Sequence, residues 1–327
     1  MSVFLAVDGG NSKTEVLLAD TTGAVLGYAR GVGTNHQTAG GLGPAMTRLD
    51  DLVRQTRESA GLSAEVRPVL AAVYLAGADL PVELAALNDA VSAADWAEKS
   101  IVDNDTFALL RAGTESPDAV AVVCGAGTNC VARAADGQTV RFPSLGALTG
   151  DWGGGAHLGS LALWHAARAE DGRGPTTGLV GAITKHFGHH TIPEVSAAIH
   201  LGTLRHDRLG ELAPAVFRVA SGGDPVARDL VVAQGKEIVT MATAALCRLG
   251  LLASPVAVVL GGGVLRTRDP MLFGVITERL RIAAPRATIT LVTDPPVLGA
   301  ALLALDALGI DGPAQARLRG EVAALSG

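Results

Sequence analysis

The first stretch whose residues could do chemistry is a glycine-rich turn between two apolar runs. The runs are Val3–Val7 and Val16–Ala19, and the turn between them holds Asp8, Gly9, Gly10, Asn11, Ser12, Lys13 and Thr14. Glycine lets the backbone approach a ligand, and successive N–H groups can hold phosphate oxygens. The hydroxyl and ammonium groups add donors, and Asp8 offers the oxygen ligand that Mg²⁺ prefers. The alternative is a tight turn with a solvated lysine, because a short glycine motif is weak evidence by itself.

A second turn of the same kind occurs near the middle of the chain. Gly125–Asn129 (GAGTN) separates the apolar runs Ala119–Val123 and Cys130–Ala134. A strand, a Gly-x-Gly turn with a hydroxyl and another strand therefore appear twice, which indicates an internal duplication with one hairpin in each domain. Two such hairpins facing each other would clamp a polyphosphate.

Asp105 is the candidate general base. It follows the short strand Ser100–Val102, and ligands of open α/β sheets bind beyond such strand ends. A carboxylate there can take a proton from a substrate hydroxyl. The alternative is that Asp105, or Asp103, caps the helix Thr106–Ala112. The sequence leaves the two interpretations open.

Three further polar residues, Asn35, Asn129 and Asp151, lie in glycine-rich loops. Sugars need dense, directional contacts to their hydroxyls, which such loops can supply, although Asn and Asp also favour turns for their own sake. The loop around Asp151, residues 141–157, suggests a backbone that approaches a ligand, or else a long surface loop. Gly261–Gly263 follows an apolar strand and could open a nucleoside pocket, with a helix-packing turn as the alternative.

The elements that would position these residues follow from periodicity and turn residues. Before residue 113 we expect strands at 3–7, 16–19, 24–30, 69–75 and 100–102 and helices at 42–60, 81–94 and 106–112. After the linker 113–118 we expect strands at 119–123, 130–134, 256–260 and 288–292 and helices at 158–169, 179–187, 192–200, 209–221, 224–249, 270–283 and 297–308, with a last helix from Pro313. This alternation predicts an α/β fold with mixed sheets covered by helices.

Composition excludes several classes of protein. The net charge is −6 and aromatic residues make up 3%, which argues against nucleic-acid binding. Three cysteines without metal-ligand spacing indicate a reducing cytoplasm. We expect no signal peptide and no membrane span, because apolar stretches are short or interrupted.

Seven motifs together resemble the N-acetylglucosamine kinases of the BadF/BadG/BcrA/BcrD ATPase family, within the actin-like ATPase and sugar kinase superfamily. In order they are DGGNSKTEVLLAD, GVGTNHQTAG, VDNDTFALL, CGAGTNCVA, TGDWGGGAHLG, ASGGDPVARDL and LGGGVLRT. The resemblance covers nearly the whole chain. It implies two RNase H-like domains, at 1–113 and 114–327, with a central cleft for ATP, Mg²⁺ and an amino sugar. The last helices could pack back on the first domain, and relatives often form homodimers.

The resemblance also implies roles for individual residues. Asp105 would be the catalytic base and Asp8 the acid near Mg²⁺. The sugar contacts would be Asn35, His36, Asp105, Asn129, Gly146, Gly150 and Asp151. The ATP contacts would be Gly10, Asn11, Ser12, Lys13, Thr14, Ala126, Gly127, Thr128, Ala220, Gly262 and Gly263.

One departure from the family concerns Trp152. Many relatives have Gly-Asp-Glu-Gly where this chain has Gly150-Asp151-Trp152-Gly153, so an indole replaces an acid and leaves the exact sugar open. The implied activity is phosphorylation of the 6-hydroxyl of N-acetylglucosamine, with glucosamine or glucose as alternatives. From other classes, the alternatives are an iron–sulfur ATPase that activates an electron-transfer partner and a non-catalytic sugar sensor.

Overall fold

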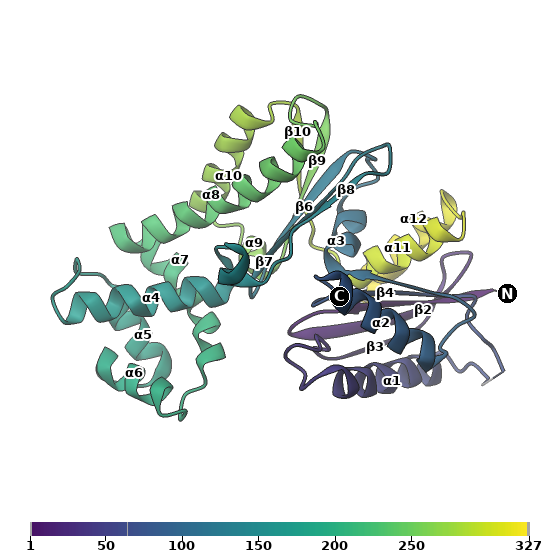
Figure 1. Ribbon diagram of the computed structural model, residues 1–327, viewed down its shortest axis with the longest axis horizontal. Coiled ribbons are helices and arrows are strands. Elements are labelled where there is room, and N and C mark those ends of the chain that lie inside the picture. Colours follow the sequence, from purple (N-terminus) through teal and green to yellow (C-terminus); the bar gives the residue numbers. More distant parts are fainter. Residues whose placement is uncertain (1, 64, 326–327) are drawn as a thin grey trace. The chain divides into compact units, whose positions relative to one another are not determined.

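The computed structural model describes residues 2–63 and 65–325, and these form two compact units (Figure 1). The described residues of Met1–Ser116 and Val292–Gly327 make up the first unit, and Pro117–Leu291 makes up the second. The sequence places its domain boundary between residues 113 and 114, and that assignment stays a prediction.

The first unit is built on a five-stranded mixed sheet in the order β3-β2-β1-β4-β5. Its strands are β1 (Val3–Gly9), β2 (Lys13–Asp20), β3 (Val25–Val32), β4 (Leu70–Leu75) and β5 (Ser100–Asn104). β1, β2 and β3 pair antiparallel, whereas β1, β4 and β5 pair parallel. All residues of β1 are buried, as expected for the central strand of a sheet covered on both faces.

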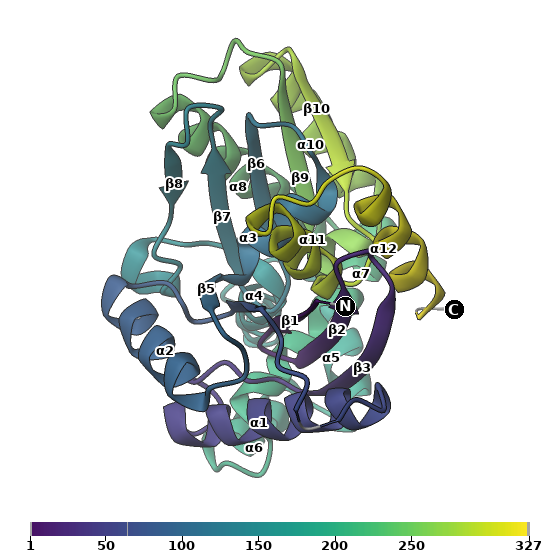
Figure 2. The same cartoon turned by 90° about the vertical axis from the view of Figure 1, so that its right-hand side faces the viewer.

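Helices cover both faces of this sheet (Figure 2). They are α1 (Leu42–Ser59), α2 (Pro81–Ala94), α3 (Asp105–Gly113), α11 (Val297–Ala307) and α12 (Pro313–Ala324). α1 and α2 bury their apolar sides against one face, and α3, α11 and α12 bury theirs against the other. The face covered by α3 and α11 is the one relevant to the candidate site. The side chain of Asp8 points to this face, and Asp105 is the first residue of α3.

The second unit repeats the plan of the first. Its sheet has the order β8-β7-β6-β9-β10, with three antiparallel strands followed by two parallel ones. The strands are β6 (Ala119–Cys124), β7 (Thr128–Arg133), β8 (Thr139–Arg141), β9 (Val256–Gly261) and β10 (Ala287–Leu291). The predicted α/β fold class and the internal duplication are therefore confirmed. β8 was missed because three residues give no periodic signal.

The helices of the second unit enclose a large apolar core. They are α4 (Gly154–Glu170), α5 (Leu179–Phe187), α6 (Ile192–His200), α7 (Ala213–Ser221), α8 (Pro225–Arg248), α9 (Gly263–Arg266) and α10 (Pro270–Ala283), with 3₁₀ turns at η1 (Gly146–Thr149) and η2 (His206–Leu212). Two differences from the prediction have local causes. Pro214 starts a new helix after η2, because proline fits the first turn of a helix and not its interior. α4 begins four residues early, because its glycines dock on the hairpin described below.

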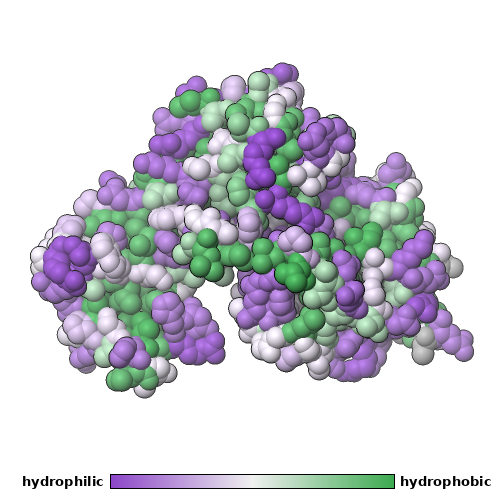
Figure 3. Space-filling view, viewed as in Figure 1, coloured by the Kyte–Doolittle hydropathy of each residue, from purple (hydrophilic) through white to green (hydrophobic). Residues whose placement is uncertain are grey.

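One helix in the part of the chain that the structure describes, α8, is long and apolar enough to cross a membrane by length and composition, and 56% of that apolar window is buried inside the structure. On the visible face of each unit, hydrophobic and hydrophilic residues are interspersed (Figure 3). Single exposed hydrophobic side chains such as Trp164 and Leu201 are ordinary features of protein surfaces.

Candidate active site

The first hairpin joins β1 and β2 through a tight turn at residues 10–13. The Gly10 N–H donates to the Lys13 carbonyl oxygen at 2.9 Å and closes the turn. Asn11 and Ser12 are exposed at its tip. The predicted hairpin is thus confirmed, and the ATP contacts expected of Gly10, Asn11 and Ser12 stay predictions.

Thr14 lies on the buried side of β2. Its side chain is buried, and its hydroxyl lies 2.9 Å from the hydroxyl of Thr34. Side chains alternate along a strand, so Thr14 faces away from Lys13, toward the side covered by α1. The Thr14 hydroxyl thus has a partner inside the first unit, and the ATP contact expected of Thr14 stays a prediction.

Lys13 is held by a buried carboxylate. Its Nζ lies 2.8 Å from Oε1 of Glu15, whose side chain is only 3% exposed. The same oxygen accepts a hydrogen bond from the Tyr28 hydroxyl at 3.0 Å. Burial, and next the charge of Glu15, raises the pKa of Tyr28 to about 12. The sequence reasoning overlooked Glu15, although an acid at the start of an apolar strand was a visible signal.

A row of polar residues runs across the first sheet from strand to strand, through Glu15 and Asp8. Asp8 stands opposite Glu15 on one side and Tyr74 on the other, and the register continues to Arg30 and Asp103 at the two edges. Directly opposed residues point to the same face of a sheet. Asp8, which is 5% exposed, thus has acidic and basic neighbours on the face that α11 covers.

Asn35 and His36 follow β3 in a compact loop. Asn35 is 5% exposed, donates from Nδ2 to Oδ1 of Asn11 at 2.6 Å, and accepts from the Gln37 N–H at 2.9 Å. The second bond is the local turn contact typical of Asn, so the turn interpretation is confirmed for this residue. His36 places Nε2 3.6 Å from Oε1 of Glu83. Sugar contacts by Asn35 and His36 stay predictions.

The cap of α3 is Asn104, not an aspartate. Asn104 Oδ1 accepts a hydrogen bond from the Thr106 N–H at 3.0 Å, and its Nδ2 donates to Asp79 at 2.9 Å. The interpretation of Asp105 or Asp103 as the helix cap is therefore wrong. Asn104 is a residue that the sequence reasoning missed, although asparagine before a helix is a common capping signal.

Asp105 is instead the first residue of α3 and is half-buried. Its carboxylate has a long contact, 3.5 Å, with the Thr106 hydroxyl. Burial raises the pKa of Asp105 from 3.8 to about 6. A carboxylate with a raised pKa at the end of a parallel strand is suited to accept a proton near neutral pH.

The second hairpin, between β6 and β7, is docked on the first turn of α4. The Gly155 N–H donates to the Gly125 carbonyl oxygen at 2.8 Å. Gly154 has a φ of 80°, and a Cβ there would lie 2.5 Å from the Cα of Gly127. At this position the glycine cluster brings two backbones together, and the approach of the loop 141–157 to a ligand stays a prediction. Ala126 and Gly127 remain exposed at the tip of the turn.

Thr128 and Asn129 join the hairpin to the loop that precedes α4. The Thr128 hydroxyl donates to the Trp152 carbonyl oxygen at 3.1 Å. Asn129 Oδ1 accepts from the Ser144 hydroxyl at 2.6 Å and from the Cys130 N–H at 2.7 Å. Both side chains therefore help to hold this loop, in addition to any role toward a ligand.

A cavity of about 280 Å³ lies beside this hairpin within the second unit. Five of the residues predicted from the sequence line it, namely Ala126, Gly127, Thr128, Gly146 and Asp151. Ser144, Ser160 and His157 also line it and were not predicted. Its lining holds hydroxyls, an imidazole and one carboxylate, but no lysine or arginine among the described residues. These side chains can bond the hydroxyls of a sugar, and the backbone N–H groups of the Ala126–Gly127 turn stay predicted phosphate contacts.

Trp152 packs on His157, with ring centroids 4.8 Å apart. Burial lowers the pKa of His157, so its imidazole is neutral near pH 7. Asp151 is fixed by two hydrogen bonds to Oδ2, from the Thr149 hydroxyl at 2.5 Å and from the Gly146 N–H at 3.1 Å. Burial, and next the charge of Asp151, raises the pKa of Glu237, so a second carboxylate lies near Asp151.

The sequence profile of the BadF/BadG/BcrA/BcrD ATPase family matches residues 5–304. The chain belongs to that family. Two curated relatives align over 93% of this chain and 98% of their own length. One is the N-acetyl-D-glucosamine kinase of Dictyostelium discoideum, 24% identical, and the other is the N-acetylmuramic acid/N-acetylglucosamine kinase of Clostridium acetobutylicum, 23% identical.

Solved structures support the fold of this ATPase-family chain. A protein from Chromobacterium violaceum, assigned provisionally as an N-acetylglucosamine kinase, has a TM-score of 0.73 at 23% identity, covering 93% of this chain and 99% of that one. A ROK family glucokinase from Streptomyces griseus has a TM-score of 0.54 at 18% identity, covering 92% of this chain and 99% of that one. At these identities the likeness concerns the fold alone.

The nucleotide contacts expected from the family resemblance in the second unit include Ala220, Gly262 and Gly263. Ala220 is 2% exposed inside the core, and the nucleotide contact expected of it stays a prediction. A Cβ on Gly262 would lie 2.3 Å from the Cys124 carbonyl oxygen, which supports the packing-turn interpretation there. Gly263 has open space around its Cα and remains a predicted contact, and Gly150 ends η1.

Gln234 is a further residue that the sequence reasoning missed. It is fully buried on α8, and its Oε1 accepts from the Gly154 N–H at 2.8 Å. A Cβ on Gly153 would lie 2.4 Å from its Nε2, so glycine is needed for this contact. A glutamine within the apolar positions of α8 was the available signal. It fixes the backbone between the cavity and α4.

Proposed function

We propose that this protein is an ATP-dependent kinase that phosphorylates the 6-hydroxyl of N-acetylglucosamine or a closely related amino sugar. Membership in an ATPase family and two full-length relatives named for N-acetylglucosamine kinase activity support the proposal. Glucosamine and glucose are the alternative acceptors within the same class.

The observation that carries the proposal is the position of Asp105. It is not needed as a helix cap, because Asn104 fills that role. Its raised pKa, about 6, leaves it mostly ionised at neutral pH yet basic enough to accept a proton. In the proposed reaction Asp105 takes the proton of the sugar hydroxyl while that oxygen attacks the γ-phosphorus. The bond between the γ-phosphorus and the bridging oxygen breaks, and ADP leaves.

Phosphoryl transfer depends mainly on positioning and on neutralising charge. The turn with exposed Asn11 and Ser12 and the turn with exposed Ala126 and Gly127 would hold phosphate oxygens through their backbone N–H groups. Mg²⁺, when bound, neutralises phosphate charge. Carboxylates are usual protein ligands of Mg²⁺, so Asp8, near the end of β1, would hold the ion.

The cavity beside the second hairpin supports the sugar side of the proposal. Asp151 and the hydroxyls of Thr128, Ser144 and Ser160 line it, and His157 adds a neutral imidazole. These groups donate to and accept from sugar hydroxyls without requiring a charged ligand. Trp152 adds an apolar surface in the same loop, as sugar sites often have.

The cysteines do not favour the alternative of an iron–sulfur ATPase. Cys124 and Cys130 are buried, and burial raises the pKa of Cys124 to about 12. Cluster ligands are thiolates, which a buried thiol of high pKa does not readily form. Cys247 lies alone on the surface of α8.

The test is a coupled assay with ATP, Mg²⁺ and a panel of N-acetylglucosamine, glucosamine, glucose, N-acetylmannosamine and N-acetylmuramic acid. We expect turnover to be fastest with an amino sugar, and product analysis should locate phosphate on the 6-oxygen. An absence of turnover on every amino sugar would refute the proposal, and iron with labile sulfide in anaerobically purified protein would support the other class. A cytoplasmic location and a homodimer stay predictions.

A further inference from the structure

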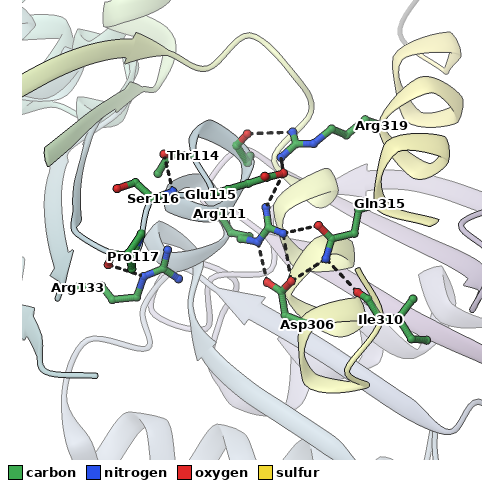
Figure 4. A network of polar contacts seen from close by, with 11 residues as sticks. Arg111, Thr114, Glu115, Ser116, Pro117, Arg133, Asp306, Ile310, Gln315 and Arg319 are labelled. Carbon is green, nitrogen blue, oxygen red and sulfur yellow. Dashed lines mark hydrogen bonds and ion pairs between the residues drawn. The ribbon is translucent and has the colours of Figure 1, made fainter. Parts of the chain in front are cut away.

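A polar cluster of two buried residues and one exposed carboxylate joins three helices of the first unit (Figure 4). Arg111, in the last turn of α3, is 5% exposed. Its guanidinium donates two hydrogen bonds to the carboxylate of Asp306 on α11, from Nε at 2.6 Å and from Nη2 at 3.1 Å. Gln315 of α12 accepts from Nη2 at 2.7 Å and donates to Asp306 at 2.8 Å. We call these three residues the Arg111 cluster.

Stability alone does not account for the Arg111 cluster. Burying an arginine costs desolvation energy, and packed apolar residues often serve as well or better. What an apolar core lacks is direction, whereas a planar guanidinium bonded to two oxygens fixes the distance and angle between its helices. The Arg111 cluster thus sets the register of α3 on α11 more tightly than apolar side chains would.

A second contact between α3 and α11 shows how closely these helices fit. A Cβ on Gly299 of α11 would lie 1.8 Å from the Ala108 carbonyl oxygen of α3. The two backbones therefore touch at mid-helix. Because α3 has only nine residues, the Gly299 contact and the Arg111 cluster hold it at two points along its length.

Asp105 depends on this placement. It begins the same helix, six residues before Arg111, a separation of about 9 Å along the axis at about 1.5 Å per residue. Its hydrogen bond within the helix, to Thr106, is long at 3.5 Å. The carboxylate therefore follows the backbone of α3. A misplacement of about 1 Å can cost about 10²-fold in rate.

We propose that Arg111, Asp306 and Gln315 are positioning residues that hold the Asp105 carboxylate in place for proton transfer. The proposal rests on the proposed function, because it takes Asp105 as the base. It assigns a role to the C-terminal helices α11 and α12, which contribute Asp306 and Gln315 from about 200 residues further along the chain.

The test compares two kinds of variant. Arg111→Lys keeps the positive charge and loses the two parallel hydrogen bonds from the guanidinium to Asp306. The triple variant Arg111→Met, Asp306→Leu, Gln315→Leu replaces the cluster by apolar residues and should remain folded. In both we expect kcat to fall by about tenfold to a hundredfold, with the KM values for sugar and ATP changed less than about twofold. The acidic limb of the pH–rate profile should also move from about pH 6, because a shift of α3 alters the burial of Asp105 and with it the pKa of its carboxylate.

Arg317→Lys is the matched control, because Arg317 forms an exposed ion pair with Glu321 on α12. It should leave kcat and the pH profile unchanged. A folded triple variant with wild-type kcat and pH profile would overturn the proposal and show that the cluster only stabilises. If Arg111→Lys failed to fold, the triple variant would still decide. Wild-type protein without turnover on any amino sugar would overturn the proposed function, and this inference with it.

Discussion

Asp105→Asn tests the most specific claim of the structure, that a half-buried carboxylate starts α3 without capping it. The substitution keeps the size of the side chain and removes its ionisation. Since the side chain of Asn104 caps α3, the Thr106 N–H keeps its hydrogen-bond acceptor in the variant. The base interpretation predicts that turnover falls by roughly 10²–10⁴-fold, the usual contribution of general-base catalysis.

Stability should change in the opposite direction. The pKa of Asp105 is about 6 in the folded protein against 3.8 for an ordinary aspartate, a rise of about two units. At roughly 1.4 kcal/mol per unit, ionising Asp105 costs the folded state about 3 kcal/mol. Below about pH 4 Asp105 is protonated in both the folded and the unfolded state, so the folded protein does not bear this cost. The stability is lost progressively as the pH rises through about 6, where Asp105 ionises in the folded state as well. Asp105→Asn does not titrate, so it should gain about 3 kcal/mol relative to wild type between about pH 4 and about pH 7.

The assay is urea unfolding of both proteins at the two pH values, together with kcat at neutral pH. Other titrating groups are common to both proteins and cancel in the difference. Asn104→Ala is the matched control, because losing the cap should cost about 1 kcal/mol at both pH values alike. A stability difference between Asp105→Asn and wild type that is constant with pH would show that the carboxylate is not buried as described. A fully active Asp105→Asn protein would place the base elsewhere, with Asp151 the next candidate.

Four further substitutions test the remaining parts of the site. Ser12→Ala should raise the KM for ATP by a few-fold to about tenfold, the scale of one hydrogen bond, and an unchanged ATP dependence of the rate would count against the phosphate role of this turn. Asp151→Ala should raise the sugar KM more than the ATP KM, and Asn35→Ala should do the same while also lowering stability by about 1–3 kcal/mol through its lost loop bonds; a selective effect on ATP would contradict the sugar placement. Gln234→Ala leaves the Gly154 N–H without its acceptor, so thermal denaturation should show a loss of about 1–3 kcal/mol, and an unchanged melting temperature would contradict the anchoring role.

The sequence by itself determined the elements and their class. Strand alternation, helical periodicity and proline at helix starts are local signals, so α2, α5, α6 and α10 begin and end where the sequence predicts. The two hairpins were visible for the same reason, since a glycine turn between apolar runs is read within about fifteen residues. Because this hairpin pattern occurs twice, the sequence already indicated two domains with sheets of the same topology.

The tertiary structure decided which side chains are free to act. Thr14, Asn35 and Glu15 all lie near the first hairpin, but only the packed sheet shows that the Thr14 hydroxyl is buried against Thr34 and that Glu15 holds Lys13. The cap of α3 depended on backbone geometry at three adjacent polar residues, Asp103, Asn104 and Asp105, which sequence cannot order.

Contacts between distant segments were beyond the sequence altogether. Arg111 meets Asp306 across 195 residues, and Gln234 meets Gly154 across 80. Neither pair leaves a periodic or spacing signal, because each partner looks locally like a polar residue in a helix or a glycine in a loop. Burial and direction belong to the folded chain, and they turn a possible base or ligand into one with a defined environment.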